Sequence, residues 1–160
     1  MIATKLTRVA SFIDSNILVY AEASDEPTKR YTALALLRHL KLSGKGVIST
    51  QVLQEFANVA LRKMGLEANH VRKQLDAHQQ FEVVQVTPTI INAAVDLHQT
   101  RSLSFYDALI VQAAITSGCD TLYSEDLNTG EIINGVKIVN PFMEKLRTSC
   151  INRDAVARRR

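Results

Sequence analysis

The chain has 160 residues, of which 46% are hydrophobic and 22% charged, as in a globular domain large enough to bury one core. It contains neither the roughly 18 consecutive apolar residues of a membrane span nor an apolar N-terminal signal segment, so we expect a cytoplasmic protein without membrane association. The net charge of +3 belongs to residues 151–160, which carry four arginines and one aspartate. We therefore expect one neutral domain over residues 1–150 and a flexible basic tail over 151–160, and the charge is weak evidence for nucleic-acid binding.

Cysteine and histidine indicate neither a redox site nor a zinc site. Cys119 and Cys150 form no Cys-x-x-Cys pair, and the four histidines are scattered without the spacing of zinc ligands. A cysteine in an apolar strand is more often a small core residue than a reactive thiol. Any chemistry is therefore expected to depend on other side chains.

Strand-like and helix-like segments alternate along the chain. In chain order the patterns predict a strand at 9–14, a helix at 27–42, a strand at 46–50, helices at 51–64 and 65–79, a strand at 81–86, helices at 88–101 and 104–117, and strands at 119–124 and 136–140. Proline opens two of these helices, at Pro27 and Pro88, and glycine follows the ends of others. Strands separated by helices predict an α/β fold, with a mainly parallel sheet of about five strands covered on both faces.

Four acidic residues fall where such a sheet gathers ligands, outside the carboxyl ends of its strands. Asp14 ends the first strand and Asp126 follows the fourth. Glu55 and Asp107 lie about one turn into helices bordering that edge, only about 5 Å from the helix starts. If they converge, they repel by about 3 kcal/mol per pair unless their pKa values rise or a divalent cation binds. Oxygen ligands without histidine or cysteine suit Mg²⁺ or Mn²⁺.

Each acid also has a purely structural explanation. Ser104 and Asp107 match a capping box, and Asp14 suits the N-cap of a short helix starting near residue 16. Glu55 flanks an apolar helix stripe as a half-exposed surface residue does, and Asp126 lies in a polar turn. Because convergence depends on the fold, both interpretations remain open for each acid taken singly.

Five segments together resemble the motifs of the PIN-domain ribonucleases, in the same order and at compatible spacings. They are FIDSNILVYA, STQVLQEFANVA, FYDALIVQAA, LYSEDLNTG and IVNPF, and they cover roughly residues 9–143. The group they resemble most is the VapC-like toxins of bacterial toxin–antitoxin pairs. The resemblance implies a three-layer α/β/α domain in which four carboxylates hold Mg²⁺ or Mn²⁺, and by motif position these belong to Asp14, Glu55, Asp107 and Asp126.

The resemblance also concerns the polar residues beside the acids. Ser15, Asn16 and Ser124 are of the kind that orient metal-binding carboxylates, and Glu125 is the substitute ligand if Asp126 points away. Two features have no counterpart in the motifs: about eight residues before the first strand, and the arginine-ended tail. Neither touches the acids, so the expected activity does not depend on them.

As a function, the resemblance implies a metal-dependent endoribonuclease in which metal-activated water cleaves the RNA phosphodiester and leaves 5′-phosphate and 3′-hydroxyl ends. It further implies a homodimer that is blocked by a small antitoxin protein. Basic side chains are available for RNA phosphates, although such residues are more often solvated surface groups: Lys29, Arg30, Arg62 and Lys63. The alternative is a catalytically inactive PIN-fold module that acts through protein contacts. A phosphoacceptor receiver domain is disfavoured, because no aspartate follows the third strand.

Overall fold

The computed structural model describes residues 9–143, in which strands and helices alternate as the sequence predicts. The strands are β1 (Ser11–Ile13), β2 (Gly46–Ser49), β3 (Glu82–Val84), β4 (Thr121–Tyr123), β5 (Ile132–Ile133) and β6 (Val136–Val139). The helices are α1 (Ser15–Glu22), α2 (Pro27–Ser43), α3 (Thr50–Arg62), α4 (Ala68–His78), α5 (Pro88–Thr100) and α6 (Phe105–Thr116). The predicted basic tail and Cys150 lie outside the described residues.

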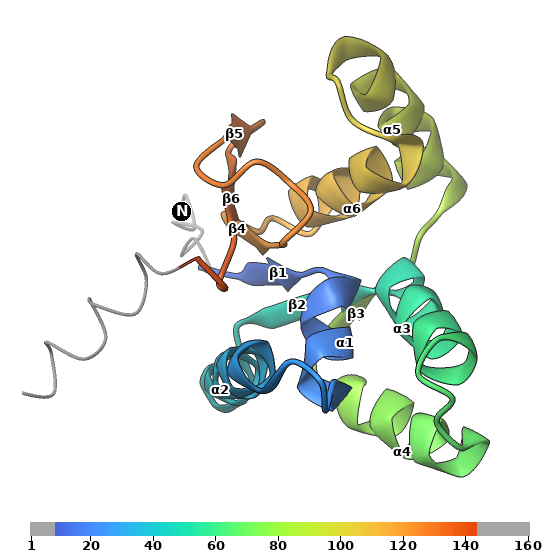
Figure 1. The fold of residues 1–160 in the computed structure, drawn as a ribbon. Helices are drawn as coiled ribbons and strands as arrows, with labels where there is room; N and C mark the ends of the chain where they lie inside the picture. Colours follow the sequence, from blue (N-terminus) through green and yellow to red (C-terminus); the bar gives the residue numbers. More distant parts are fainter. Residues whose placement is uncertain (1–8, 144–160) are drawn as a thin grey trace, which may run out of the picture.

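The strands form one six-stranded sheet in the order β3-β2-β1-β4-β6-β5. Every neighbouring pair is parallel except β5 with β6. The chain leaves central β1 toward β2 and β3, and then returns to place β4 on the other side of β1 (Figure 1). The carboxyl ends of β1 and β4 therefore adjoin at the point where the direction of winding reverses, which is where sheets of this kind bind ligands.

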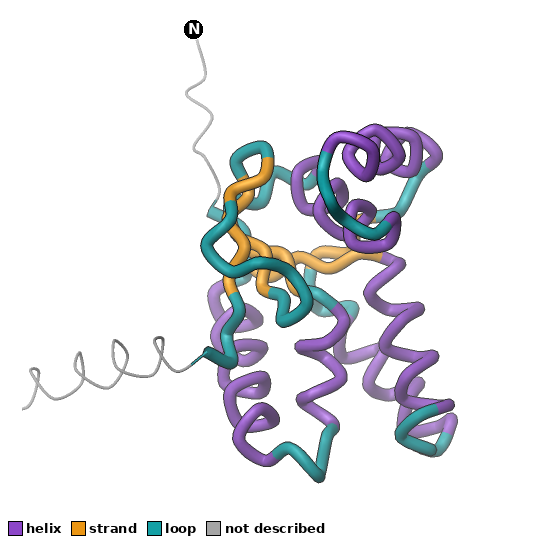
Figure 2. Tube along the Cα trace, turned by 45° about the horizontal axis from the view of Figure 1, so that its top comes forward, coloured by secondary structure: helices purple, strands orange, loops and turns teal. Residues whose placement is uncertain are grey.

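Helices cover both faces of the sheet. Helices α1 to α4 lie on one face, and α5 and α6 lie on the other (Figures 1 and 2). The core between these layers is closed by large, fully buried side chains, among them Phe12, Ile13, Val52, Phe56, Leu122 and Ile138. The predicted three-layer α/β/α fold is thus confirmed. No helix within residues 9–143 is long and apolar enough to cross a membrane.

The sheet has one strand more than the five that the sequence predicts. β5 contains only two residues and pairs antiparallel with β6 through a turn at Asn134 and Gly135, whose φ angles are +47° and +87°. Asn-Gly favours this turn because both residues accept positive φ. The hydrophobic pattern missed β5 because two residues are too few to show a period.

Candidate functional site

Asp14 lies at the carboxyl end of β1, at the reversal point of the sheet. Its backbone N–H donates to the carbonyl of Tyr123 at the end of β4, over 3.0 Å. Its side chain is only 5% exposed and caps α1 by accepting the backbone N–H of Ser15, over 2.6 Å. The hydroxyl of Ser124 donates to the other carboxylate oxygen over 2.7 Å. The N-cap interpretation of Asp14 is therefore confirmed, and it leaves the carboxylate among the other polar groups at this edge.

The environment of Asp14 favours its neutral form. Burial raises the pKa of this carboxyl from 3.8 to about 6, although the hydrogen bonds from Ser124 and Ser15 oppose the rise. The charges of Glu55 and Asp126 raise the same pKa further. Glu55 and Asp126 are therefore close enough to Asp14 to act on its carboxyl electrostatically.

The first turn of α1 connects these three acids. The hydroxyl of Ser15 lies 2.6 Å from Oε2 of Glu55 and 3.3 Å from Oδ1 of Asp14, so its single hydrogen goes to the nearer Glu55. The side-chain amide of Asn16 donates to Oδ2 of Asp126 over 3.0 Å and lies 3.4 Å from Oδ2 of Asp14. Ser15 and Asn16 thus occupy the positions between carboxylates that the sequence assigns to orienting residues.

Asp107 lies in the first turn of α6, and it joins the cluster less directly. Its backbone N–H donates to the hydroxyl of Ser104 over 3.1 Å, which is half of the predicted capping box. The half-buried carboxylate itself forms no hydrogen bond or ion pair with any residue from 9 to 143. The Asp107 carboxylate is therefore free to bind another group. It does not accept the backbone N–H of Ser104, which would be the second hydrogen bond of a capping box.

Gln51 connects the start of α6 to Glu55, a role that the sequence patterns did not indicate. Its side chain is 5% exposed, and its Nε2 donates to Oε1 of Glu55 over 2.8 Å and to the carbonyl of Tyr106 over 3.2 Å. The residue next to Tyr106 is Asp107. One signal was available, because Gln51 precedes Glu55 by four residues and so lies on the same face of α3.

Glu125 points away from the cluster toward a cation. Its carboxylate forms an ion pair with Lys29 of α2, and Lys29 also donates to the hydroxyl of Tyr20 over 3.0 Å. These bonds raise the pKa of Lys29. Asp126, not Glu125, therefore faces Asn16. The sequence makes Lys29 a candidate for contacts with RNA. In the structure its ammonium group is paired with Glu125, which lies 96 residues further along the chain.

The donor set suits a hard divalent cation. All the groups are oxygens, and two buried amide oxygens, Oδ1 of Asn16 and Oε1 of Gln51, accept no hydrogen bond within the described part of the chain. In the present arrangement no three acidic, histidine or cysteine side chains of residues 9–143 are grouped to hold one ion. Hydrogen bonds from Ser15 and Asn16 occupy carboxylate lone pairs that a cation would use.

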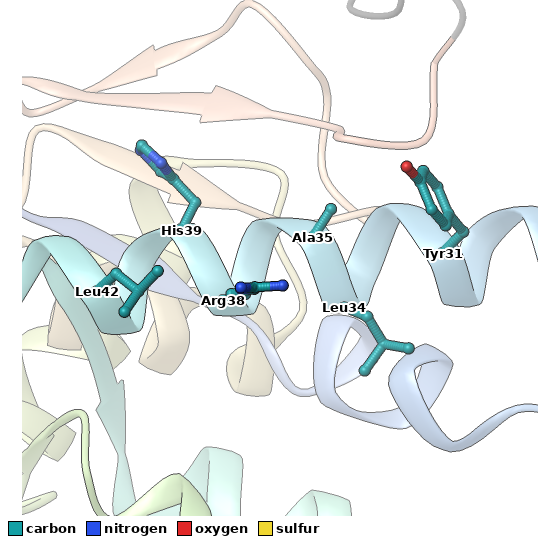
Figure 3. A pocket seen from close by; sticks show the side chains of 6 residues that line it. All are labelled: Tyr31, Leu34, Ala35, Arg38, His39 and Leu42. Atoms are coloured by element: carbon teal, nitrogen blue, oxygen red, sulfur yellow. The ribbon is translucent and has the colours of Figure 1, made fainter.

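Two hollows on the surface of the described residues differ in their relation to the acids. The larger, of about 550 Å³, is on the outer face of α2 and is lined by Tyr31, Leu34, Ala35, Arg38, His39 and Leu42 (Figure 3). It contains no acidic residue, so it is separate from the cluster. The smaller, of about 330 Å³, includes Gln51, which contacts Glu55 directly.

Fold and site together define a doubly wound α/β protein with an acidic site at the reversal point of its sheet. The model of one family, the PIN domain, matches residues 11–132. The chain belongs to the PIN domain family, as its motifs indicated. A comparison with curated protein sequences gave no match.

Solved structures of toxin–antitoxin proteins share the fold. A toxin–antitoxin complex from Klebsiella pneumoniae is 22% identical with a TM-score of 0.64, over 82% of this chain and 98% of that one. VapBC2 from Rickettsia felis, bound to a DNA fragment from its promoter, is 18% identical with a TM-score of 0.61, over 82% and 98%. VapC20 from Mycobacterium tuberculosis, a sarcin-ricin loop cleaving toxin, is 20% identical with a TM-score of 0.56, over 72% and 88%. The similarity to VapC-like proteins is therefore confirmed at the level of the fold.

Proposed function

We propose that this protein is an endoribonuclease that depends on Mg²⁺ or Mn²⁺ and serves as the toxin of a toxin–antitoxin pair. The observation that supports it most is the position of Asp14, buried at the reversal point of a PIN-domain sheet with the charges of Glu55 and Asp126 acting on it. A structural N-cap needs no second and third carboxylate beside it. A carboxyl pKa raised by burial and, further, by neighbouring acids is typical of active sites.

In this proposal the four acids hold the cation, and their neighbours hold the acids. Asp14, Glu55, Asp107 and Asp126 are the ligands, and Asn16 brings an additional amide oxygen. A bound divalent cation supplies positive charge for the phosphate oxygens and activates water at neutral pH. Ser124 fixes the carboxylate of Asp14, and Ser15 orients that of Glu55 through its hydroxyl.

The proposed partners follow from the neighbours. The Klebsiella structure is a toxin–antitoxin complex, the Rickettsia structure is VapBC2 bound to promoter DNA, and VapC20 is a sarcin-ricin loop cleaving toxin. By analogy we propose RNA as the substrate, a small antitoxin protein as the inhibitor, a homodimer as the active form, and the cytoplasm as the place of action. The alternative is an inactive PIN-fold module that acts only through protein contacts.

Incubation of the purified chain with a pool of structured RNAs tests the activity, in Mg²⁺, in Mn²⁺ and in EDTA. Asp14→Asn removes one charge from the cluster at almost constant volume, and Asp25→Asn makes the same change at an exposed site outside the cluster. We expect cleavage in both metals and none in EDTA. The loss in Asp14→Asn should exceed the roughly 100-fold that removal of a group supporting a metal ligand costs.

Mn²⁺ binding, measured by electron paramagnetic resonance, provides a second readout that does not need the RNA target. Wild type and Asp25→Asn should bind Mn²⁺, and Asp14→Asn should bind it at least about tenfold more weakly. Metal binding without cleavage of the pool would indicate a selective enzyme and justify a wider search for substrates. If wild type neither binds Mn²⁺ nor cleaves RNA, the nuclease proposal is contradicted and the interaction module is favoured.

A further inference from the structure

The smaller hollow opens between the start of α3 and the start of α6, next to the acid cluster. It has a volume of about 330 Å³ and is lined by Thr50, Gln51, Gln54, Val86, Ile91, Phe105, Tyr106 and Leu109. Thr50 follows the carboxyl end of β2 directly, so the hollow lies at the same edge of the sheet as Asp14. Its volume is at the lower end of the range for sites that take a small ligand or one unit of a larger one.

Three polar side chains in the hollow have unused hydrogen-bonding capacity. The hydroxyl of Thr50 accepts the backbone N–H of Val86 over 3.2 Å, and no described residue accepts its hydrogen. Oε1 of the buried Gln51 has no donor among residues 9–143. Its orientation is fixed, because Nε2 of the same amide donates to two acceptors. The exposed amide of Gln54 is unbonded within the described chain.

An aromatic surface borders these polar groups. Tyr106 is 66% exposed although it belongs to the first turn of a helix that is otherwise deeply buried. The rings of Phe105 and Tyr106 make a T-shaped contact, with centroids 5.5 Å apart at an angle of 65°. An exposed ring that is steadied by a second ring offers a surface for stacking, and unpaired nucleobases stack on aromatic side chains.

We propose that this hollow binds an unpaired nucleobase of the substrate RNA, next to the phosphate that is cleaved. The inference rests on the proposed nuclease function and deepens it. Tyr106 stacks on the base, while the Thr50 hydroxyl and the exposed Gln54 amide offer donors and an acceptor to its edge. Gln51 contacts both Glu55 and Tyr106, so a single side chain separates the base from the acids. The expected substrate is therefore single-stranded at the cleavage point, with a base preference set by the hollow.

A first experiment measures binding without cleavage. The four 5′-mononucleotides are titrated in Mg²⁺ into wild type and into Tyr106→Ala and Gln54→Ala, and followed by NMR chemical shifts. Tyr31→Ala is the matched control, because Tyr31 is also exposed, at 75%, but lies in the α2 hollow away from the acids (Figure 3). We expect one base to bind best, with shifts at Thr50 and Phe105. Tyr106→Ala should weaken binding about tenfold, and Tyr31→Ala should leave it unchanged.

A second experiment compares base preferences in a randomised single-stranded RNA, by sequencing the cleaved ends. Tyr106→Ala and Gln54→Ala should raise KM and flatten the preference beside the cut, while kcat stays close to that of wild type. Light scattering of the same variants detects any change in oligomeric state. If Tyr106→Ala dissociates a dimer and leaves the base preference intact, the hollow belongs to an interface between two copies and the proposal is wrong.

The two proposals fail in different ways. If wild type cleaves RNA, and both Tyr106→Ala and Gln54→Ala cleave it with the same KM and base preference, the base subsite is overturned and the nuclease is retained. If wild type binds a mononucleotide at Thr50 and Phe105 but neither binds Mn²⁺ nor cleaves RNA, base binding in the hollow is retained and the nuclease is overturned. Mononucleotide shifts that remain unchanged in Tyr106→Ala place binding elsewhere and also contradict the subsite.

Discussion

A carboxylic acid and an imidazole are buried among residues 9–143, Asp14 at the end of β1 and His78 at the end of α4, and they differ in what surrounds them. Asp14 accepts hydrogen bonds from Ser15 and Ser124, and it lies near two further acids. His78 packs edge-on against Phe56, with centroids 5.0 Å apart, and its Nε2 has no partner among residues 9–143.

Burial is the largest cause of the pKa shift at both residues. It raises the pKa of Asp14 to about 6, and together with the charge of Lys41 it lowers the pKa of His78 from 6.5 to about 4. A shifted pKa alone therefore does not identify an active site in this fold. What distinguishes Asp14 is its polar surroundings, in which Ser15 and Ser124 hold the carboxylate beside two further acids, whereas His78 packs against Phe56 and its Nε2 has no partner among residues 9–143.

The largest expected effect on stability concerns Asp14 in the absence of metal. Because its folded-state pKa lies above the ordinary value of 3.8, the folded state binds the proton more tightly, and stability is lost as the pH rises from 3.8 through 6. The loss amounts to about 3 kcal/mol at pH 7. Asp14→Asn should remove most of it, so in EDTA the variant unfolds at higher urea than wild type at pH 7.

Urea unfolding at pH 7 and pH 4, with Asp25→Asn as the control, measures this difference. The advantage of Asp14→Asn should nearly vanish at pH 4, where wild type already carries the proton for most of the time. If Asp14→Asn proves less stable than wild type at pH 7, the carboxylate stabilises the fold, and the contrast with His78 is wrong.

A somewhat smaller effect of opposite sign is expected at His78. Its folded-state pKa lies below the ordinary 6.5, so its contribution to stability is complete above pH 6.5 and is lost as the pH falls toward 4. At pH 5 the loss is about 2 kcal/mol. His78→Leu should lack this acid-side loss, whereas His39→Leu on the exposed face of α2 should retain it. Unfolding curves at pH 7 and pH 5 separate the two, and RNA cleavage should be the same in all three proteins at pH 7.

The smallest expected effect tests Lys29, the cation that is paired with Glu125. Lys29→Met removes the partner of Glu125 and leaves the chain between Ser124 and Asp126 less firmly held. Both partners are partly exposed, so the stability change should stay below about 1 kcal/mol. Mn²⁺ affinity should fall by less than about tenfold, because Lys29 acts on the site only through Glu125. A loss as large as that of Asp14→Asn would mean that Lys29 belongs to the site itself.

Most of the fold could be predicted from the sequence, because most helices and strands have local signals in their own residues. Pro27, Pro88, Gly44 and Gly118 mark helix ends, and the apolar runs mark the parallel strands. The short β5 gave no such signal. Its pairing depends on the turn at Asn134 and Gly135, which brings two residues against β6.

The acids could be located from the sequence, but their contacts could not. Asp14 and Asp126 follow from the ends of strands, whereas the contact between Glu55 and Ser15 joins side chains 40 residues apart. The ion pair of Lys29 with Glu125 spans 96 residues and depends on how α2 packs beside the loop after β4. Contacts of this kind arise from tertiary packing, which no local pattern encodes.

The pairing of β1 with β4 also has a consequence for synthesis. Asp14 emerges from the ribosome 110 residues before Ser124, which fixes its carboxylate. Closing so long a loop is late and slow compared with local helix formation. A nascent chain that ends before residue 124 contains Asp14, Glu55 and Asp107 and cannot bring them to a completed edge. For the nuclease that we propose, the growing chain stays harmless until Ser124 and Asp126 have been synthesised and the edge can close, before any inhibitor is needed.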